Sequence, residues 1–168
     1  MRCGIGYDIH RFAEGRRLML GGVEIAHPRG LEGHSDADVL SHAIADALLG
    51  AIGAGDIGQH FPNTDESIRD ISSIEILKRV TKLLAEKKAR VVNVDASVII
   101  EAPRLAPHVP AMRQKIAAAI GVSQLNVSVK ATTNEKLGSI GRGEGIAAIA
   151  IATVEMVGRV RRTRRKRD

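Results

Sequence analysis

The residue types most suited to binding a metal ion occur first in residues 33–46, which read Gly-His-Ser-Asp-Ala-Asp-Val-Leu-Ser-His-Ala-Ile-Ala-Asp. This stretch begins as a polar turn and continues as a helix. Asp38, His42 and Asp46 stand four residues apart and therefore share one helix face. Carboxylates one turn either side of a histidine are a common way to hold a metal-binding imidazole in one tautomer. The alternative interpretation is a solvated polar face with an ordinary histidine.

A second candidate pair lies near the N-terminus. Asp8 and His10 are two residues apart in an expected strand over residues 1–12, so both side chains point to the same face. Together with His42 they supply one carboxylate and two imidazoles, the donor set of a zinc site that keeps its fourth position open. Divalent manganese and iron accept the same donors. The alternative is a capped turn beside a buried histidine. The three other histidines, at positions 27, 60 and 108, are expected to be surface or core residues.

A third stretch, residues 130–145, could bind phosphate. It reads Lys-Ala-Thr-Thr-Asn-Glu-Lys-Leu-Gly-Ser-Ile-Gly-Arg-Gly-Glu-Gly and follows an expected strand. Backbone N–H groups, hydroxyls and basic side chains of this kind can form a nest for phosphates, although neither a Walker motif nor a dinucleotide fingerprint is present. Glu135 fits such a site if a hard cation such as Mg²⁺ bridges it to the phosphates. The alternative is a mobile hairpin loop with surface charges.

The elements that must position these residues follow from the spacing of apolar side chains. Helical spacing predicts three helices, and alternation predicts four strands and a hairpin that turns at Gly21-Gly22. Ser72 and Glu75 are predicted to form a capping box. The expected fold is a single α/β domain whose mixed sheet is covered on one face by about three helices. The helices are expected at about 39–52, 73–88 and 107–120, the strands at 1–12, 90–100, 125–131 and 146–157, the hairpin at 17–26, and loops at 56–65 and 132–145.

Composition narrows the class of protein. The chain of 168 residues carries a formal net charge of +6, and seven Lys/Arg and one acid within 159–168 account for all of it. We therefore expect a charge-balanced domain over residues 1–157 and a basic, disordered tail over 158–168. Three aromatic residues are too few for a base-stacking surface, so nucleic-acid binding is not expected. One cysteine, no apolar run that could span a bilayer and no signal peptide favour a reducing, cytoplasmic location.

Several separated motifs together resemble one family. They are Asp8-Ile9-His10, residues 33–38, His42, Asp56-Ile57-Gly58, Phe61-Pro62, residues 131–138 and residues 141–145, and they cover nearly all of residues 1–157. The chain resembles 2-C-methyl-D-erythritol 2,4-cyclodiphosphate synthases of the bacterial non-mevalonate isoprenoid pathway. The resemblance implies a phosphorus–oxygen lyase that converts 4-diphosphocytidyl-2-C-methyl-D-erythritol 2-phosphate to the cyclic diphosphate and releases CMP.

The resemblance also implies a homotrimer with active sites between subunits and a role for each matching residue. Zinc would be held by Asp8, His10 and His42, and magnesium or manganese by Glu135, while His34 and Thr133 would stabilise the transition state. Arg142 and Glu144 would lie near the trimer axis, where family members can hold an isoprenoid diphosphate. The substrate would contact Asp8, Ile9, His10, His34, Ser35, Asp56, Ile57, Gly58, Phe61, Pro62, Asn63, Thr64 and Asp65, together with Ile100, Glu101, Ala102, Pro103, Arg104, Leu105, Ala106, Thr132, Thr133, Asn134, Glu135, Ser139 and Arg142, of which residues 100–106 and 132–135 would come from the adjacent subunit.

The chain departs from the family pattern at a few positions. Ser139 stands where an aromatic residue is usual, Asn134 replaces a frequent threonine, and the basic tail has no counterpart. Asp38 or Asp46 is expected to orient an imidazole of the metal site. The competing hypotheses are a zinc-dependent phosphohydrolase with the same ligands, a nucleic-acid-binding protein that acts through its tail, and a non-catalytic trimeric binder of isoprenoid diphosphates.

Overall fold

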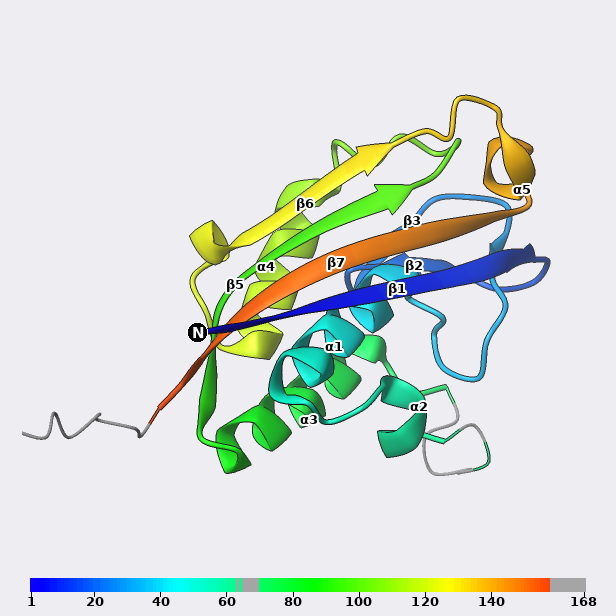
Figure 1. The fold of residues 1–168 in the computed structure, drawn as a ribbon. Coiled ribbons are helices and arrows are strands. Elements are labelled where there is room, and N and C mark those ends of the chain that lie inside the picture. Colours follow the sequence, from blue (N-terminus) through cyan, green and yellow to red (C-terminus); the bar gives the residue numbers. More distant parts are fainter. Residues whose placement is uncertain (63, 65–69, 158–168) are drawn as a thin grey trace, which may run out of the picture.

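A five-stranded mixed sheet organises the computed structural model, which describes residues 1–62, 64 and 70–157. The strand order is β4-β1-β7-β5-β6. Strand β1 pairs antiparallel with β4 and β7, and β5 pairs antiparallel with β7 but parallel with β6 (Figure 1). The strands are β1 (Arg2–Ala13), β4 (Gly30–Leu31), β5 (Ala89–Ile99), β6 (Val127–Thr132) and β7 (Gly145–Met156), and a separate hairpin joins β2 (Leu18–Leu20) to β3 (Val23–Ile25).

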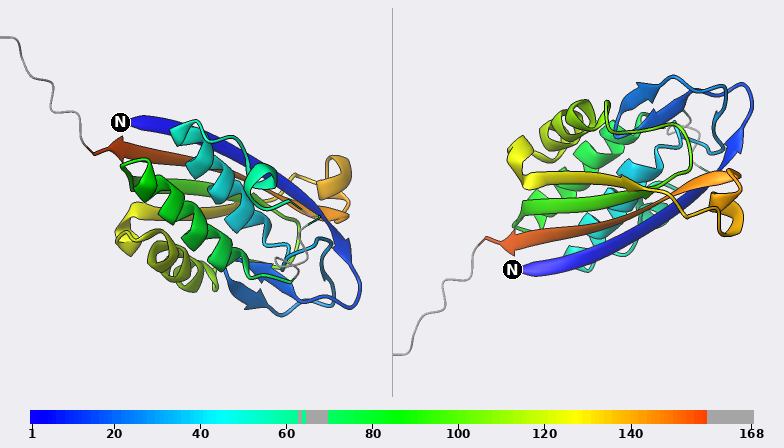
Figure 2. Two further views of the ribbon diagram at one scale, coloured as in Figure 1. Left: turned by 90° about the horizontal axis from the view of Figure 1, so that it is seen from below. Right: turned by 90° about the horizontal axis from the view of Figure 1, so that it is seen from above.

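Three long helices cover one face of this sheet and leave the other face bare (Figure 2). They are α1 (Val39–Ile52), α3 (Ser73–Glu86) and α4 (Val109–Ile120). The prediction of a single α/β domain with helices on one face of a mixed sheet is confirmed. Helix α1 lies at the centre, in contact with β1, β7 and α3, and nearly all its side chains are buried.

Strand β1 and helix α1 pack with their backbones in contact. A Cβ atom on Gly6 would lie 1.9 Å from the Ala43 carbonyl oxygen, and one on Gly4 would lie 2.1 Å from that of Ala47. Because glycine has no side chain, the strand and the helix can approach this closely. The approach brings the functional side chains of β1 beside His42 on α1.

The bare face of the sheet is apolar. Five large side chains there are 40–65% exposed, and the register of β1 against β7 places Ile5 opposite Ile151 and Tyr7 opposite Ile149. A contiguous apolar patch on a water-facing sheet is typical of a surface that binds another protein. The five side chains are Ile5, Tyr7 and Ile9 of β1 with Ile149 and Ile151 of β7.

Several local predictions are corrected. The expected loops at 56–65 and 132–145 contain short helices, α2 (Ile57–His60) and α5 (Gly138–Gly141), and the strand expected from residue 125 begins at Val127 after a 3₁₀ turn, η2 (Gln124–Asn126). The capping box is wrong, because the Ser72 side chain makes no capping hydrogen bond. The Asp36 carboxylate instead accepts from the backbone N–H of Ser73, at 3.0 Å. Among the described residues no helix has the length and apolar character needed to cross a membrane.

Candidate functional site

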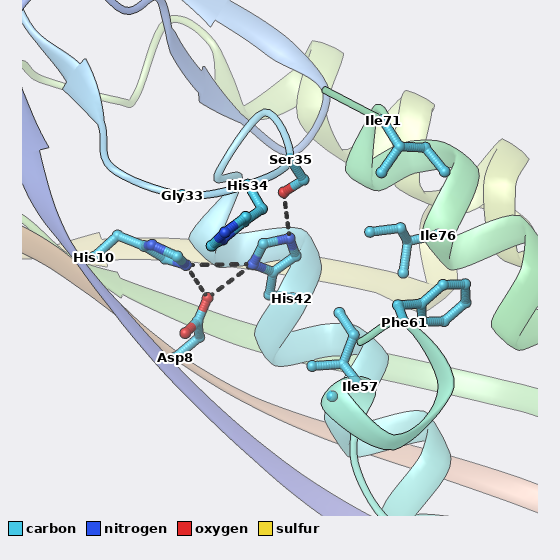
Figure 3. A pocket seen from close by; sticks show the side chains of 11 residues that line it. Asp8, His10, Gly33, His34, Ser35, His42, Ile57, Phe61, Ile71 and Ile76 are labelled. Carbon is cyan, nitrogen blue, oxygen red and sulfur yellow. Dashed lines mark hydrogen bonds and ion pairs between the residues drawn. The ribbon is translucent and has the colours of Figure 1, made fainter. Parts of the chain in front are cut away.

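Three side chains from β1 and α1 meet at one point. Asp8 Oδ2 lies 2.9 Å from His10 Nε2 and 3.0 Å from His42 Nδ1, and the two nitrogens are 3.4 Å apart (Figure 3). All three ligand atoms lie within 4.8 Å of one another. The sequence prediction that the strand pair would meet the helix histidine is therefore met by the geometry. Two imidazole nitrogens and a carboxylate oxygen that converge in this way fit a divalent transition metal.

The electrostatics of the cluster are those of a cation site. Burial raises the pKa of Asp8, but hydrogen bonds and charges from His10 and His42 outweigh burial and hold the pKa well below its ordinary value. Burial lowers the pKa of His10, and the hydrogen bond and charge of Asp8 outweigh it and raise the pKa. The Asp8 carboxylate thus favours its ionised form, and because metal ions bind deprotonated ligands, a metal ion would compete with protons for this cluster.

The His10 ring nitrogen that faces away from Asp8, Nδ1, also has a hydrogen-bond partner. His10 Nδ1 lies 2.6 Å from the backbone carbonyl oxygen of Glu32. Because a carbonyl only accepts, Nδ1 must carry a proton, which leaves Nε2 as the nitrogen through which His10 can bind a metal ion. A backbone carbonyl behind a metal-binding imidazole is a recurring way to fix its tautomer.

Asp38 does not orient His42, which corrects one half of the sequence expectation. Its carboxylate accepts hydrogen bonds from the backbone N–H groups of Gly21, Gly22 and Ser41 and from the Ser41 hydroxyl, at 2.7–3.0 Å. Burial raises the pKa of Asp38, whereas these four donors favour its charged form. The residue stands at the N-cap of α1, so the first turn and the β2–β3 hairpin use its oxygens.

Asp46 does not orient His42 either. Its Oδ1 atom accepts from the backbone N–H of Ile57 at 2.7 Å and so ties α1 to α2. The four-residue spacing places the carboxylates and the histidine on one helix face, but each carboxylate bonds to backbone groups of another segment. The hydroxyls of Ser73 and Ser35, at 2.9 Å and 3.2 Å, contact His42 Nε2 instead.

The cluster opens into a pocket of about 240 Å³. One wall carries Gly33, His34 and Ser35, and the other is apolar (Figure 3). Of the lining residues, the sequence prediction missed Gly33, Ile71 and Ile76; Ile76 was recognised only as part of the buried stripe of a helix. The apolar wall consists of Ile57, Gly58, Phe61, Ile71 and Ile76.

The substrate-contacting residues predicted to come from the adjacent subunit gather elsewhere on the described chain. Glu101 accepts hydrogen bonds from the backbone N–H groups of Asn134 and Lys136, at 3.0 Å and 3.3 Å, and from Lys136 Nζ at 2.5 Å. Thr133 Oγ1 donates to the Glu135 carboxylate at 2.9 Å. The connection after β5 and the loop after β6 thus form one surface, and none of these residues lines the pocket around Asp8.

The comparisons with known proteins agree with this geometry. The family model described as the YgbB family matches residues 1–155. The chain belongs to the YgbB family. It is 59% identical over 155 residues to the 2-C-methyl-D-erythritol 2,4-cyclodiphosphate synthase of Chlorobium luteolum and 57% identical over 155 residues to that of Syntrophomonas wolfei; each match covers 92% of this chain and 99% of the relative.

Solved structures share the YgbB-family fold. A 2C-methyl-D-erythritol-2,4-cyclodiphosphate synthase in its CDP-bound form superposes with a TM-score of 0.84 at 33% identity, over 92% of this chain and all of that one. The IspF–CDP complex of Plasmodium falciparum gives 0.81 at 33% identity, over 94% and 97% of the two chains. The bifunctional IspDF of Campylobacter jejuni gives 0.89 at 41% identity, and the match covers 92% of this chain but 42% of that longer one.

The remaining predicted site residues of this YgbB-family chain either lie apart from the pocket or are not among the residues that the structure describes. Ile9 points to the bare sheet face, where it lines a hollow of about 230 Å³ with Ser139. Asp56 caps α2 through the N–H of Gln59, and Arg142 pairs with Glu144 at 2.7 Å. Ile100 and Leu105 are buried. Pro62, Thr64, Ala102, Arg104, Ala106 and Thr132 are exposed and Pro103 is partly exposed, while Asn63, Asp65 and the tail over 158–168 lie outside the described residues.

Proposed function

We propose that this protein converts 4-diphosphocytidyl-2-C-methyl-D-erythritol 2-phosphate to 2-C-methyl-D-erythritol 2,4-cyclodiphosphate with release of CMP, as a phosphorus–oxygen lyase of the non-mevalonate isoprenoid pathway. The observation that carries the proposal is the convergence of Asp8, His10 and His42 at the mouth of a pocket with one apolar wall. The names of relatives up to 59% identical support it.

The donor chemistry fits two cations. Asp8, His10 and His42 would hold zinc, because two imidazoles and one carboxylate suit that ion with one position left for substrate. Glu135 would hold magnesium or manganese, which prefer a carboxylate oxygen, phosphate oxygens and water. When bound, these cations supply positive charge and Lewis acidity to the phosphate groups.

The chemistry needs no ionisable nucleophile from the protein. The 2-phosphate of the substrate is already an anion, and its oxygen attacks the β-phosphorus while the bond to the CMP oxygen breaks. The main barrier to ring closure is repulsion between the negatively charged phosphate groups. Two unit charges about 4 Å apart repel by roughly 4 kcal/mol at an effective dielectric of 20. His34 and Thr133 would donate hydrogen bonds to the charge that develops.

The apolar wall explains why ring closure would prevail over hydrolysis. Ile57, Phe61, Ile71 and Ile76 face the pocket opposite His34 and Ser35. These side chains would pack against the carbon backbone of the substrate, hold the 2-phosphate close to its target and exclude water. A phosphohydrolase would need an ordered water molecule at the position that this wall would shield.

A homotrimer would complete the site. Within one chain, the pocket around Asp8 and the surface around Glu101 are separate, and the apolar sheet face with Ile5 and Ile151 is 50–65% exposed at these two residues. Packing three such faces around an axis would bury the apolar side chains. It would also bring residues 100–106 and 132–135 of one subunit to the pocket of the next. Arg142 would lie near the axis, where an isoprenoid diphosphate could bind.

Two further parts of the proposal concern the ends of the domain and its location. Catalysis would reside in residues 1–157, the tail over 158–168 would not be required for turnover, and the enzyme would act in the bacterial cytoplasm. A truncated protein ending at residue 157 is expected to keep full activity.

A product assay by ³¹P NMR tests the proposed reaction. The purified protein with zinc and magnesium is expected to yield the cyclic diphosphate and CMP in equal amounts, whereas the substrate analogue without the 2-phosphate should remain unchanged. Open-chain phosphates as products would instead identify a phosphohydrolase, and no turnover with either metal would refute the proposal.

A further inference from the structure

We propose that Ser73 and Asp36 are positioning residues that fix the tautomer of the metal ligand His42. The inference rests on the metal centre of the proposed function, and it concerns two residues that neither touch the pocket nor belong to the predicted ligand set. Ser73 is the first residue of α3 and is fully buried. Asp36 lies in the polar turn before α1.

The three side chains form a chain of hydrogen bonds with a fixed direction. The Ser73 hydroxyl donates a short hydrogen bond to Asp36 Oδ1, and Ser73 Oγ lies 2.9 Å from His42 Nε2. A serine hydroxyl carries a single proton, and a carboxylate can only accept. Since that proton is used on Asp36, Ser73 Oγ can only accept from His42, so Nε2 must carry a proton. Nδ1, which faces Asp8 and His10, is thereby left as the nitrogen of His42 that a metal ion would bind.

The nearby hydroxyl of Ser35 cannot fix the tautomer in the same way. Ser35 Oγ lies 3.2 Å from His42 Nε2 and accepts the backbone N–H of Ala37 at 3.1 Å. Its own proton goes to no other described acceptor, so this hydroxyl could either donate to Nε2 or accept from it. The two serines therefore contact the same nitrogen with different hydrogen-bonding constraints, which makes Ser35 a matched control.

Asp36 is itself held from two sides, which makes the chain rigid. Its Oδ2 atom accepts the Ser73 backbone N–H at 3.0 Å, and its Oδ1 atom accepts the Asp38 backbone N–H at 3.3 Å. The carboxylate thus joins the start of α3 to the start of α1. A carboxylate behind a hydroxyl also polarises the hydroxyl oxygen, so that it becomes a better acceptor for the imidazole N–H.

The hydrogen bond between Ser73 and His42 has a counterpart at His10. There the Glu32 carbonyl accepts from Nδ1 and frees Nε2, whereas here Ser73 accepts from Nε2 and frees Nδ1. In each imidazole, the nitrogen beside Asp8 is thus left as the metal-binding atom. In other metalloproteins, mutation of a group that hydrogen-bonds to a metal ligand typically lowers metal affinity by about 10–100-fold.

Zinc competition titration of the purified protein measures the effect. Ser73→Ala is expected to weaken zinc binding by about 10–100-fold, while Ser35→Ala should weaken it by less than about threefold because the Ser73 acceptor remains. If Asp36 acts through Ser73, then the Asp36→Ala, Ser73→Ala double variant should bind zinc no more weakly than the weaker single variant. Equal zinc affinity in Ser73→Ala and wild type, or full additivity in the double variant, would overturn the inference.

A measurement on the wild-type protein removes any dependence on how the variants fold. In protein loaded with ¹¹³Cd and ¹⁵N-labelled at histidine, cadmium is expected to couple to Nδ1 of His42 and to Nε2 of His10. Coupling to Nε2 of His42 would overturn the inference. Failure of wild type to bind zinc or cadmium would refute the proposed metal centre itself, whereas tight wild-type binding that survives Ser73→Ala refutes only the positioning role.

Discussion

Replacing Gly6 with alanine would push helix α1 away from strand β1 and open the metal site that these two elements share. The new Cβ would lie 1.9 Å from the Ala43 carbonyl oxygen and 2.7 Å from the Ala47 nitrogen. Ordinary contacts begin near 3.4 Å, so the helix must move by about 1.5 Å, because both neighbours are backbone atoms that no rotamer change can displace. His42 directly precedes Ala43 and would move with it.

A displacement of that size exceeds the tolerance of a metal site, which is about 0.2 Å in ligand distance. Gly6→Ala is expected to cost about 1–3 kcal/mol of unfolding free energy through overpacking. It should also weaken zinc binding at least tenfold and slow CMP release by about 100-fold, the order expected for a 1 Å misplacement of reacting groups. Guanidinium unfolding, zinc competition and CMP release measure the three effects.

Gly50→Ala is the matched control. Gly50 lies on the same helix against the same strand, but its added Cβ would meet Ile5 O at 3.8 Å and Gly4 Cα at 3.9 Å, which are ordinary contacts. Alanine in place of this helical glycine should raise the unfolding free energy by about 1 kcal/mol and leave zinc affinity unchanged. Equal zinc affinity and turnover in the two variants would refute the account of how β1 and α1 build the site.

Three further perturbations test other parts of the account. His42→Ala should abolish zinc retention and CMP release together, as metal analysis and a product assay would show; full turnover by the metal-free variant would contradict the proposed role. Asp38→Ala removes the acceptor of four buried donors and should lower the unfolding free energy in urea by on the order of 3 kcal/mol; a change below about 0.5 kcal/mol, the size of an ordinary surface substitution, would refute that role. Ile151→Asp should convert a trimer to monomers in light scattering, because an unpaired carboxylate is costly to bury at an interface; a variant that stays trimeric would place the interface elsewhere.

The metal ligands were predictable because local spacing decides which way each side chain points. Two-residue spacing in a strand places Asp8 and His10 on one face, and helical periodicity turns His42 toward the sheet. The close packing of β1 against α1 then brings the three together. What the spacing could not show is that Gly4 and Gly6 permit this approach, since a glycine in a strand can equally mark a bulge or a tight bend.

The partners of His42 could not be predicted for a related reason. Helical spacing correctly places Asp38 and Asp46 on the face of His42, but it does not show which other groups compete for their oxygens. The Asp38 carboxylate accepts hydrogen bonds from the N-terminus of α1 and from the β2–β3 hairpin, and the Asp46 carboxylate accepts one from the N-terminus of α2. Ser73 lies 31 residues from His42 in sequence, and only the packing of α3 against α1 brings it to the ring.

The central claim, that a metal ion at Asp8, His10 and His42 gathers the phosphates of the substrate, is tested most directly by anomalous diffraction at the zinc edge from crystals of the active protein. The account predicts a peak about 2.0–2.2 Å from Asp8 Oδ2, His10 Nε2 and His42 Nδ1, with a phosphate oxygen at the fourth position when CDP is bound. Crystals of fully active protein with no anomalous peak among these three atoms would contradict it.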